Sequence, residues 1–162
     1  MKFYVRRADT TKPETITMLC YLQKKILPSD DIFMPTTGYW WFVTNDQGKT
    51  VGFAGMVRSI RWTDTGYLCR AGILDDYTGN GLQKRLIRAR IKQARKLGWN
   101  WIITDTTNNP PSANSLINAG FKIYKPGCPW STRTAIYWKY KVKPNAVQRR
   151  EYKKAKVQRV QP

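Results

Sequence analysis

Residues 75–86 read DDYTGNGLQKRL. Two glycines, Gly79 and Gly81, enclose one asparagine between an apolar run and a long basic segment with the pattern of a helix. Glycine has no Cβ, so this turn can adopt unusual dihedral angles and bring its backbone N–H groups close to a ligand. A helix start adds unpaired N–H groups and a partial positive charge, which together suit a phosphate. A plain strand-to-helix turn uses the same residues, so the rest of the chain has to decide.

The composition indicates one folded domain with an anionic partner. A chain of 162 residues with 41% hydrophobic and 13% aromatic residues is large and apolar enough to form a core. The 29 lysines and arginines against 10 aspartates and glutamates give a net charge of +19. Such an excess indicates nucleic acid, a membrane surface or a nucleotide cofactor as a partner.

The absence of histidine excludes Ser-His-Asp and Cys-His nucleophiles. The three cysteines, Cys20, Cys69 and Cys128, are too far apart for a CxxC pair and indicate free thiols in a reducing compartment. We expect no metal site. The first residues lack the apolar region of a signal peptide, and no stretch approaches a membrane span, so we expect a soluble, cytoplasmic protein without membrane contact.

Periodicity and turn residues predict the elements on both sides of the glycine turn. Before the turn, the sequence predicts strands at 2–7, 39–45, 50–60 and 65–74 and a helix at 13–27. After it, the sequence predicts helices at 81–97 and 112–119 and strands at 100–105, 121–124 and 134–142. This is a mixed α/β pattern around a single sheet. We expect a domain at 1–142 and, at 143–162, a basic tail that is flexible or becomes helical on a partner.

The predicted helix at 81–97 has one broad apolar face and one basic face. Arg90 is the exception, because it falls outside the basic arc. No acidic residue interleaves with the basic ones, which excludes a simple lacing by salt bridges. The basic face lies on an arc of roughly 120° and consists of Lys84, Arg85, Arg88, Lys92, Arg95 and Lys96.

The glycine turn matches neither a P-loop, because GxxxxGK[ST] is absent, nor a dinucleotide fingerprint, because Lys84 occupies the third glycine position. The order of elements resembles instead the GCN5-related N-acetyltransferase (GNAT) family over residues 1–142. Three stretches carry the resemblance, in family order: TNDQGKTVGFAGM at 44–56, AGILDDYTGNGLQKRLI at 71–87 and TNNPPSANSLINAGF at 107–121. The first is similar to the family's second and third strands, the second to its acetyl-CoA loop, and the third to its Asn-containing signature that ends in Gly-Phe.

This resemblance implies a mixed, mostly antiparallel sheet flanked by helices, with an acetyl-CoA loop between the fourth strand and the long basic helix. Ile73 and Leu74 would offer backbone groups to the pantetheine arm. Asn109 and Ser112 match family positions that face coenzyme A. The remaining cofactor-binding positions would wrap the pyrophosphate with backbone N–H groups, and they are Thr78, Gly79, Asn80, Gly81, Leu82 and Gln83.

The sequence departs from the family pattern at three positions, one of which is Gln83, where a third small residue is common. Thr78 occupies the place of the usual loop arginine, although most of the contact there is made by the main chain. Leu116 occupies the place where many members carry the tyrosine that protonates the departing thiolate. That role is either vacant or filled by Tyr67, Tyr124 or Tyr137. Tyr67 also lies near the position where several members place a base.

Acyl transfer to an amine requires a neutral nitrogen, a polarised thioester carbonyl and a proton donor for the thiolate. With no histidine, the candidate bases are Asp75, Asp76, Asp105 or a chain of water molecules. Asp105 ends a strand that splays from its neighbour in this fold and can face the acceptor, or it caps the turn at 106–109. We take Asp105 and Tyr67 as the candidate catalytic residues.

The function that fits these observations is an acetyl-CoA-dependent N-acyltransferase. The net charge favours an amine on nucleic acid or on a nucleic-acid-associated protein as the acceptor, and Trp62, flanked by Arg58 and Arg61, can stack on a base. Two alternatives stay open. One is modification of a DNA base, because the sequence is loosely similar to phage Mom proteins, which place an Asp at the end of the corresponding strand. The other is a binding module that kept the fold and lost catalysis, as Leu116 suggests.

Overall fold

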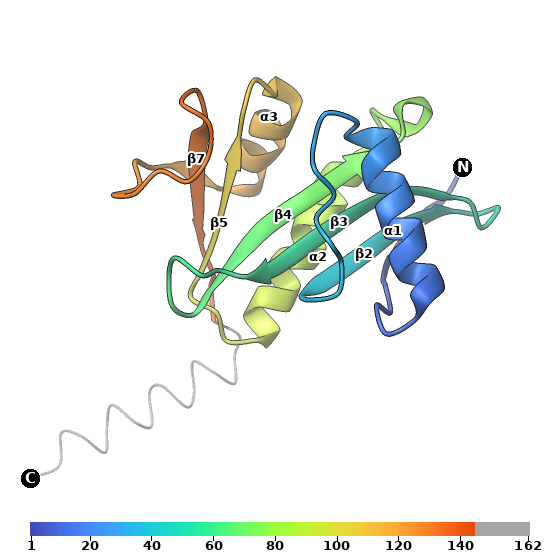
Figure 1. The fold of residues 1–162 in the computed structure, drawn as a ribbon, viewed down its shortest axis with the longest axis horizontal. Coiled ribbons are helices and arrows are strands. Elements are labelled where there is room, and N and C mark those ends of the chain that lie inside the picture. Colours follow the sequence, from blue (N-terminus) through green and yellow to red (C-terminus); the bar gives the residue numbers. More distant parts are fainter. Residues whose placement is uncertain (145–162) are drawn as a thin grey trace, which may run out of the picture.

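The structure, a computed structural model, describes residues 1–144, and the predicted tail lies outside the described residues from residue 145 on (Figure 1). The order of the elements is the predicted one, with boundaries that shift by a few residues. Within residues 1–144, no helix is both long and apolar enough to cross a membrane. The elements are β1 (Phe3–Arg7), α1 (Pro13–Ile26), β2 (Tyr39–Asn45), β3 (Thr50–Arg58), β4 (Thr65–Ile73), the 3₁₀ turn η1 (Asp75–Tyr77), α2 (Leu82–Lys96), β5 (Trp101–Thr106), α3 (Pro110–Ala119), β6 (Lys122–Ile123) and β7 (Ile136–Lys141).

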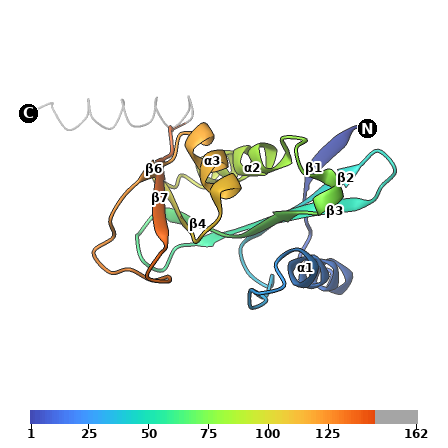
Figure 2. The ribbon, with the colours of Figure 1, turned by 90° about the horizontal axis from the view of Figure 1, so that it is seen from above.

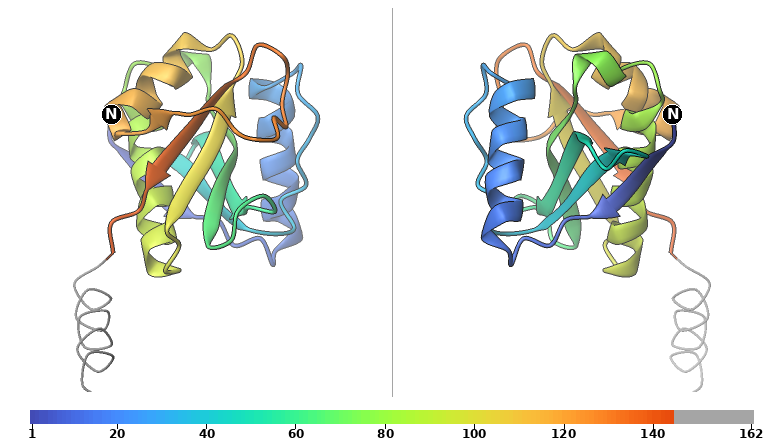
Figure 3. Two further views of the ribbon diagram at one scale, coloured as in Figure 1. Left: turned by 90° about the vertical axis from the view of Figure 1, so that its left-hand side faces the viewer. Right: turned by 90° about the vertical axis from the view of Figure 1, so that its right-hand side faces the viewer.

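These strands form one seven-stranded sheet in the order β1-β2-β3-β4-β5-β7-β6. All neighbouring pairs are antiparallel except β4 and β5, which are parallel. Helix α1 covers one face of the sheet, and α2 and α3 cover the other (Figures 2 and 3). The fold class predicted from the sequence, a mixed and mostly antiparallel sheet flanked by helices, is therefore confirmed.

The core has two layers, one on each face of the sheet. Leu19 and Leu22 of α1 pack with Trp40 and Phe53 on one face, and all four side chains are fully buried. The apolar stripe of α2 fills the other face together with β5, α3 and β7. Its buried members include Leu86, Ile87, Ile91 and Ala94, which recur at the three- and four-residue spacing that one helix face requires.

Two irregularities open the centre of the sheet. The parallel pairing of β4 with β5 covers only three residues and ends at Tyr67 and Ile103, after which the strands separate (Figure 1). In addition, β4 carries one extra residue opposite β3, because Ala71 pairs with Ala54 whereas Leu68 pairs with Met56. Beyond this point β4 and β5 have no ladder pairing with each other within residues 1–144, and they remain linked by side-chain hydrogen bonds such as that from the Thr104 hydroxyl to the Leu68 carbonyl at 3.0 Å.

Candidate active site

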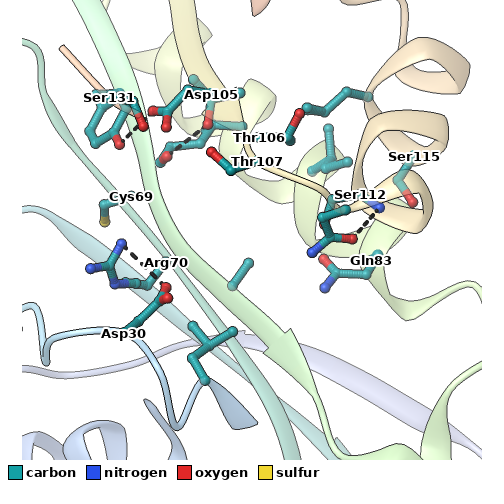
Figure 4. Close-up of a pocket in the computed structure, with 18 of the residues that line it drawn as sticks. Asp30, Cys69, Arg70, Gln83, Asp105, Thr106, Thr107, Ser112, Ser115 and Ser131 are labelled. Carbon is teal, nitrogen blue, oxygen red and sulfur yellow. Dashed lines mark hydrogen bonds and ion pairs between the residues drawn. The ribbon is translucent and has the colours of Figure 1, made fainter. Parts of the chain in front are cut away.

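A cavity of about 620 Å³ occupies the gap between β4 and β5 (Figure 4). It reaches both faces of the sheet, because the loop after α1 lines it on one side and helices α2 and α3 line it on the other. The walls come from that loop, from β4, from the first turns of α2, from the end of β5 and the turn that follows it, from α3, and from the loop before β7.

The glycine turn lies between η1 and α2 and has the backbone conformation that only glycine adopts without strain. Gly79 has φ +77° and Gly81 has φ +67°, both in the left-handed region. A Cβ built at either glycine meets no atom within 4 Å. The glycines are therefore required by the turn's conformation and not by packing against the protein, and the space in front of them is free for a ligand.

The backbone N–H groups at 79–84 make no hydrogen bond to the described part of the chain. The first N–H that α2 pairs is that of Arg85, which is donated to the Gly81 carbonyl at 3.2 Å. The Asn80 side chain points back into the turn and donates to the carbonyls of Tyr77 and Thr78. Open N–H groups at a helix start, with a free approach past two glycines, fit the diphosphate of acetyl-CoA. Thr78 contributes less, since its own N–H and hydroxyl are donated to the Asp75 carbonyl.

The prediction for Leu74 needs correction. Its N–H is donated to the Val51 carbonyl at 2.9 Å, and its carbonyl accepts the N–H of Tyr77 at 2.9 Å. Successive residues of an antiparallel strand point their backbone groups to opposite edges, so those of Ile73 and Ala71 face away from β3 and toward the gap. Ile73 thus keeps the backbone position expected from the sequence, whereas Leu74 is occupied within the chain.

Residues of α2 and α3 meet on one side of the cavity. Figure 4 shows Gln83 of α2 beside Ser112 and Ser115 of α3. Asn109 lines the cavity as expected, but its side-chain oxygen accepts the Ser112 N–H at 3.1 Å and caps α3. Because this cap precedes Pro110, the helix begins two residues earlier than the sequence predicts.

Asp105 lies at the end of β5 and joins two aromatic side chains. Its Oδ1 accepts the Tyr67 hydroxyl at 3.0 Å and the Trp130 Nε1–H at 3.1 Å. No hydrogen bond from the turn at 106–109 reaches its carboxylate among the described residues. The second oxygen, Oδ2, is left to the cavity that Asp105 lines. The structure therefore brings together the two residues proposed as catalytic and favours the acceptor-facing role of Asp105 over turn capping.

The three tyrosines considered as substitutes for Leu116 differ in what their hydroxyls do. Burial, together with the adjacent Asp105 carboxylate, raises the pKa of Tyr67 above that of free tyrosine, and its proton is committed to Asp105. The Tyr137 hydroxyl accepts the N–H groups of Trp130 and Ser131 and supports the loop. The Tyr124 hydroxyl is buried without a partner among residues 1–144, and burial raises its pKa to about 12. Of the three tyrosines, only Tyr67 lines the cavity that Leu116 also lines.

Two residues that shape the site carry no sequence signal. Trp130 reaches Asp105 from a loop 25 residues further along the chain. Thr106 lines the cavity, and its hydroxyl accepts the Trp138 Nε1–H at 2.9 Å, which leaves the hydroxyl proton available. The positions of Trp130 and Thr106 both depend on which residues of β5 and β7 face each other. The two other candidate bases, Asp75 and Asp76, are exposed in η1 and do not line this cavity.

Two arginines line the cavity near the extra residue of β4. Arg70 forms an ion pair with Asp30 at 3.7 Å and donates to the Asp31 carbonyl. Arg90, the exception on the basic helix, is almost fully buried and donates to the carbonyls of Leu86 and Gly55 at 3.3 and 3.4 Å. Burial lowers the pKa of Arg90 to about 10, so the side chain keeps its charge at neutral pH.

The family model of the acetyltransferase (GNAT) family matches residues 10–121, which is more than half of the chain. The protein belongs to this family. No match is found among curated protein sequences.

Solved structures of other acetyltransferases share the fold at low sequence identity. A Bacillus subtilis acetyltransferase in complex with CoA has a TM-score of 0.68 and 18% identity, and the match covers 88% of this chain and 100% of that chain. The ribosomal-protein-S18-alanine N-acetyltransferase of Escherichia coli has a TM-score of 0.66 and 15% identity, over 90% and 97% of the two chains. An IAA acetyltransferase from Bacillus cereus has a TM-score of 0.65 and 14% identity, over 86% and 99%.

As a GNAT acetyltransferase, the protein is an enzyme that transfers an acetyl group from acetyl-CoA to an amine. The family defines the donor and the reaction type. The family does not define the acceptor, and the similar acetyltransferases of known structure carry names with different acceptors.

Proposed function

We propose that this GNAT acetyltransferase acetylates an amine of a nucleic acid or of a nucleic-acid-associated protein. The observation that carries the proposal is the outer face of α2. Its five exposed cations have no acidic residue among them, and the ion pairs within residues 1–144, Arg58–Asp64 and Arg70–Asp30, lie elsewhere. Lys84, Arg88 and Lys92 are exposed at four-residue spacing, so they form a row with steps of about 6 Å along the helix.

A row of unneutralised cations is costly through self-repulsion unless an anionic partner offsets it. Two neighbours of the row are held in place by backbone carbonyls, since Arg85 donates to Phe3 at 2.7 Å and Arg95 donates to Lys143 at 2.9 Å. A polyanion such as the phosphate backbone of nucleic acid supplies charges in sequence along such a row. The name of the similar E. coli enzyme supports a macromolecular acceptor for this fold, because that enzyme acts on a ribosomal protein.

In the proposed site, the N–H groups at 79–84 bind the diphosphate and the open edge of β4 at Ala71 and Ile73 orients the pantetheine arm. When bound, acetyl-CoA supplies an activated acetyl thioester. The acceptor amine attacks from the α1 side of the gap, where Asp105 lies, and the amine proton passes to the carboxylate. Tyr67 and Trp130 fix the Asp105 carboxylate through hydrogen bonds, so its free oxygen has a defined direction.

The sequence left two alternatives open. Loss of catalysis is not favoured, because family membership comes with a carboxylate held at the gap between β4 and β5. None of the similar proteins reported above is a phage modification protein, and base modification of the Mom type rests only on the position of Asp105. We therefore base the acceptor proposal on the charge of α2.

The proposal is tested by incubating the protein with isotope-labelled acetyl-CoA and three acceptor pools: DNA, RNA and ribosomal proteins. Mass spectrometry then identifies the acetylated amine. Binding to DNA and RNA is measured in parallel as a function of salt concentration. Replacing Lys84, Arg88 and Lys92 together by glutamine should make the slope of log K against log salt shallower by up to about 2.7 on duplex DNA, at about 0.9 per phosphate.

The matched control replaces Lys12, Lys24 and Lys25, which carry the same charge on or beside α1 and are exposed on the other face of the sheet. If both triple variants change the slope equally, the α2 face is not the contact. If no pool is acetylated and neither DNA nor RNA binds at low salt, the acceptor is of another class.

A further inference from the structure

Helix α1 covers only part of its face of the sheet, and the β5–β7 region of that face is without a helix (Figure 3). Side chains alternate between the faces of a strand, so Trp101, Ile103 and Asp105 of β5 point to this side. Their β7 partners in register are Lys141, Lys139 and Tyr137. This face thus mixes aromatic rings with cations and leads along the strands to Asp105, with Ile103 and Tyr137 buried and the remaining side chains half-buried or exposed.

Four half-buried rings form a continuous row on this face, which we call the aromatic strip. The ring centroids are 6.0 Å apart between Trp101 and Trp62, 5.3 Å apart between Trp62 and Tyr124, and 6.5 Å apart between Tyr124 and Trp130. The row ends at the active site, because the Trp130 Nε1–H is donated to Asp105 at 3.1 Å. The strip therefore joins the protein surface to the candidate base.

Three cations are placed along the aromatic strip. Lys141 lies 5.8 Å from the ring centroid of Trp101, Lys139 lies 5.3 Å from that of Tyr124, and Arg61 lies 4.9 Å from that of Trp130. Within residues 1–144, none of the three has a carboxylate within ion-pair distance. The acidic residue nearest in the chain, Asp64, is paired with Arg58 at 3.5 Å.

Two hollows flank the aromatic strip. An open groove of about 720 Å³ runs past Trp62, Trp101 and Lys141. A more apolar hollow of about 300 Å³ lies between Arg61, Tyr67 and Trp130 and so adjoins the active-site cavity, which Tyr67 also lines. A ligand that follows the strip therefore has room beside the rings at both ends of the strip, and the second hollow lies next to the Trp130 ring that contacts Asp105.

We propose that the aromatic strip binds an unpaired segment of nucleic acid, with bases stacked on the rings and phosphates on the interleaved cations, and delivers a base to Asp105. Rings beside cations in a groove are the arrangement that binds single strands, because every base has a face that stacks and every nucleotide has a phosphate. In a duplex the base faces are hidden, and a base must leave the stack to reach a recessed site. The strip thus selects a single strand or an extruded nucleotide.

The Asp105 carboxylate at the end of the strip narrows the chemical class of the acceptor further, and this step rests on the proposed function. An exocyclic amine of adenine, cytosine or guanine is neutral at pH 7, so it can attack without prior deprotonation. A bond forms between this nitrogen and the carbonyl carbon of the acetyl group, the carbon–sulfur bond breaks, the amine proton passes to Asp105, and the thiolate sulfur takes up a proton from water to leave as the thiol. Thymine has no exocyclic amine, so it should bind without being acetylated.

Binding is measured by fluorescence anisotropy with a labelled single-stranded oligothymidylate and with a duplex of the same length. The wild-type protein should bind the single strand more tightly than the duplex. Trp62→Ala should weaken single-strand binding roughly 5- to 150-fold, since stacking on one ring contributes about 1–3 kcal/mol per base. Lys139→Gln removes one side-chain charge and keeps most of the side chain's length, so it should leave the fold intact. It should make the slope of log K against log salt shallower by about 0.7.

Tyr21→Ala and Lys25→Gln are the matched controls, because Tyr21 is an exposed ring with the Lys25 ammonium 5.7 Å from its centroid on α1. They should leave single-strand binding unchanged. The proposal is overturned if the duplex binds as tightly as the single strand, or if Lys139→Gln and folded Trp62→Ala bind like the wild type. Equal competition by polyglutamate would also overturn it, because the strip would then recognise acidic protein.

A separate arm tests transfer with labelled acetyl-CoA and oligomers of adenylate, cytidylate and thymidylate. Label on adenylate or cytidylate and not on thymidylate is the expected result. If the strip variants lose single-strand binding but no oligomer is acetylated, the strip stands as a binding site and the acceptor is a protein bound to the same nucleic acid. If an oligomer is acetylated equally by wild type and strip variants, the proposed function stands and the strip proposal fails.

Discussion

Replacement of Gly81 by alanine tests the glycine turn. Gly81 has φ +67°, where an L-residue is strained by about 1–2 kcal/mol. Part of this is offset by the lower freedom of alanine in the unfolded chain, about 0.4–1 kcal/mol, so the net loss of stability is about 1 kcal/mol. No atom lies within 4 Å of the added Cβ, so no clash adds to this loss. The melting temperature should fall by about 2–4 °C.

The loss of cofactor affinity should be larger than the loss of stability. The added methyl group occupies the free space beside the open N–H groups at 79–84, through which the diphosphate approaches. A hydrogen bond to a charged group contributes about 1.5–3 kcal/mol, so losing one weakens binding roughly 10- to 100-fold. Calorimetric titration with CoA measures the affinity, and differential scanning calorimetry measures the melting temperature.

Gly48→Ala is the matched control. Gly48 lies in the turn between β2 and β3, has φ +80°, and likewise has no atom within 4 Å of a built Cβ. The two variants should therefore lose similar stability, whereas only Gly81→Ala should lose affinity. Equal affinity for CoA in both variants would refute the assignment of the diphosphate to this turn.

The remaining predictions concern the ionisable groups. Asp105→Asn should lower the acetylation rate about 10²- to 10⁴-fold and leave CoA affinity unchanged, because the amide oxygen keeps the hydrogen bonds from Tyr67 and Trp130 but cannot take the amine proton. Since the Asp105 carboxylate helps raise the pKa of Tyr67, alkaline absorbance titration should also show Tyr67 ionising at lower pH in this variant. Iodoacetamide at pH 8 should alkylate exposed Cys128 well before Cys69, whose pKa burial raises to about 11, and peptide mapping distinguishes the sites. Burial raises the pKa of Tyr124 to about 12, so the contribution of the neutral Tyr124 side chain to stability is complete below pH 10 and is lost as the pH rises to 12. Tyr124→Phe should therefore make the fall in melting temperature between pH 10 and pH 12 shallower. An unchanged pH profile in this variant would contradict the raised pKa of Tyr124.

Local patterns in the sequence determined the order of elements and much of the site. Hydrophobic periodicity separated helices from strands, and the spacing of Gly79 and Gly81 before a basic helix located the left-handed glycine turn with its open N–H groups, because dihedral preferences and helix-end hydrogen bonds act over a few residues. The position of Asp105 at the end of a strand followed from the same local signals. These inferences need no knowledge of strand pairing.

Only the tertiary structure decided the contacts that depend on strand pairing. Three contacts are of this kind: Asp105 accepts a hydrogen bond from Trp130, Leu74 donates its N–H to β3, and Arg90 is buried against the Gly55 carbonyl. They arise from the register of the strands, from the extra residue in β4 and from the separation of β4 and β5. A shift of one residue in register reverses the face of every side chain in a strand, and residues far apart in sequence carry no local sign of that register. For the same reason the aromatic strip, drawn from the β3–β4 loop, β5 and the segment before β7, became visible only in the folded chain.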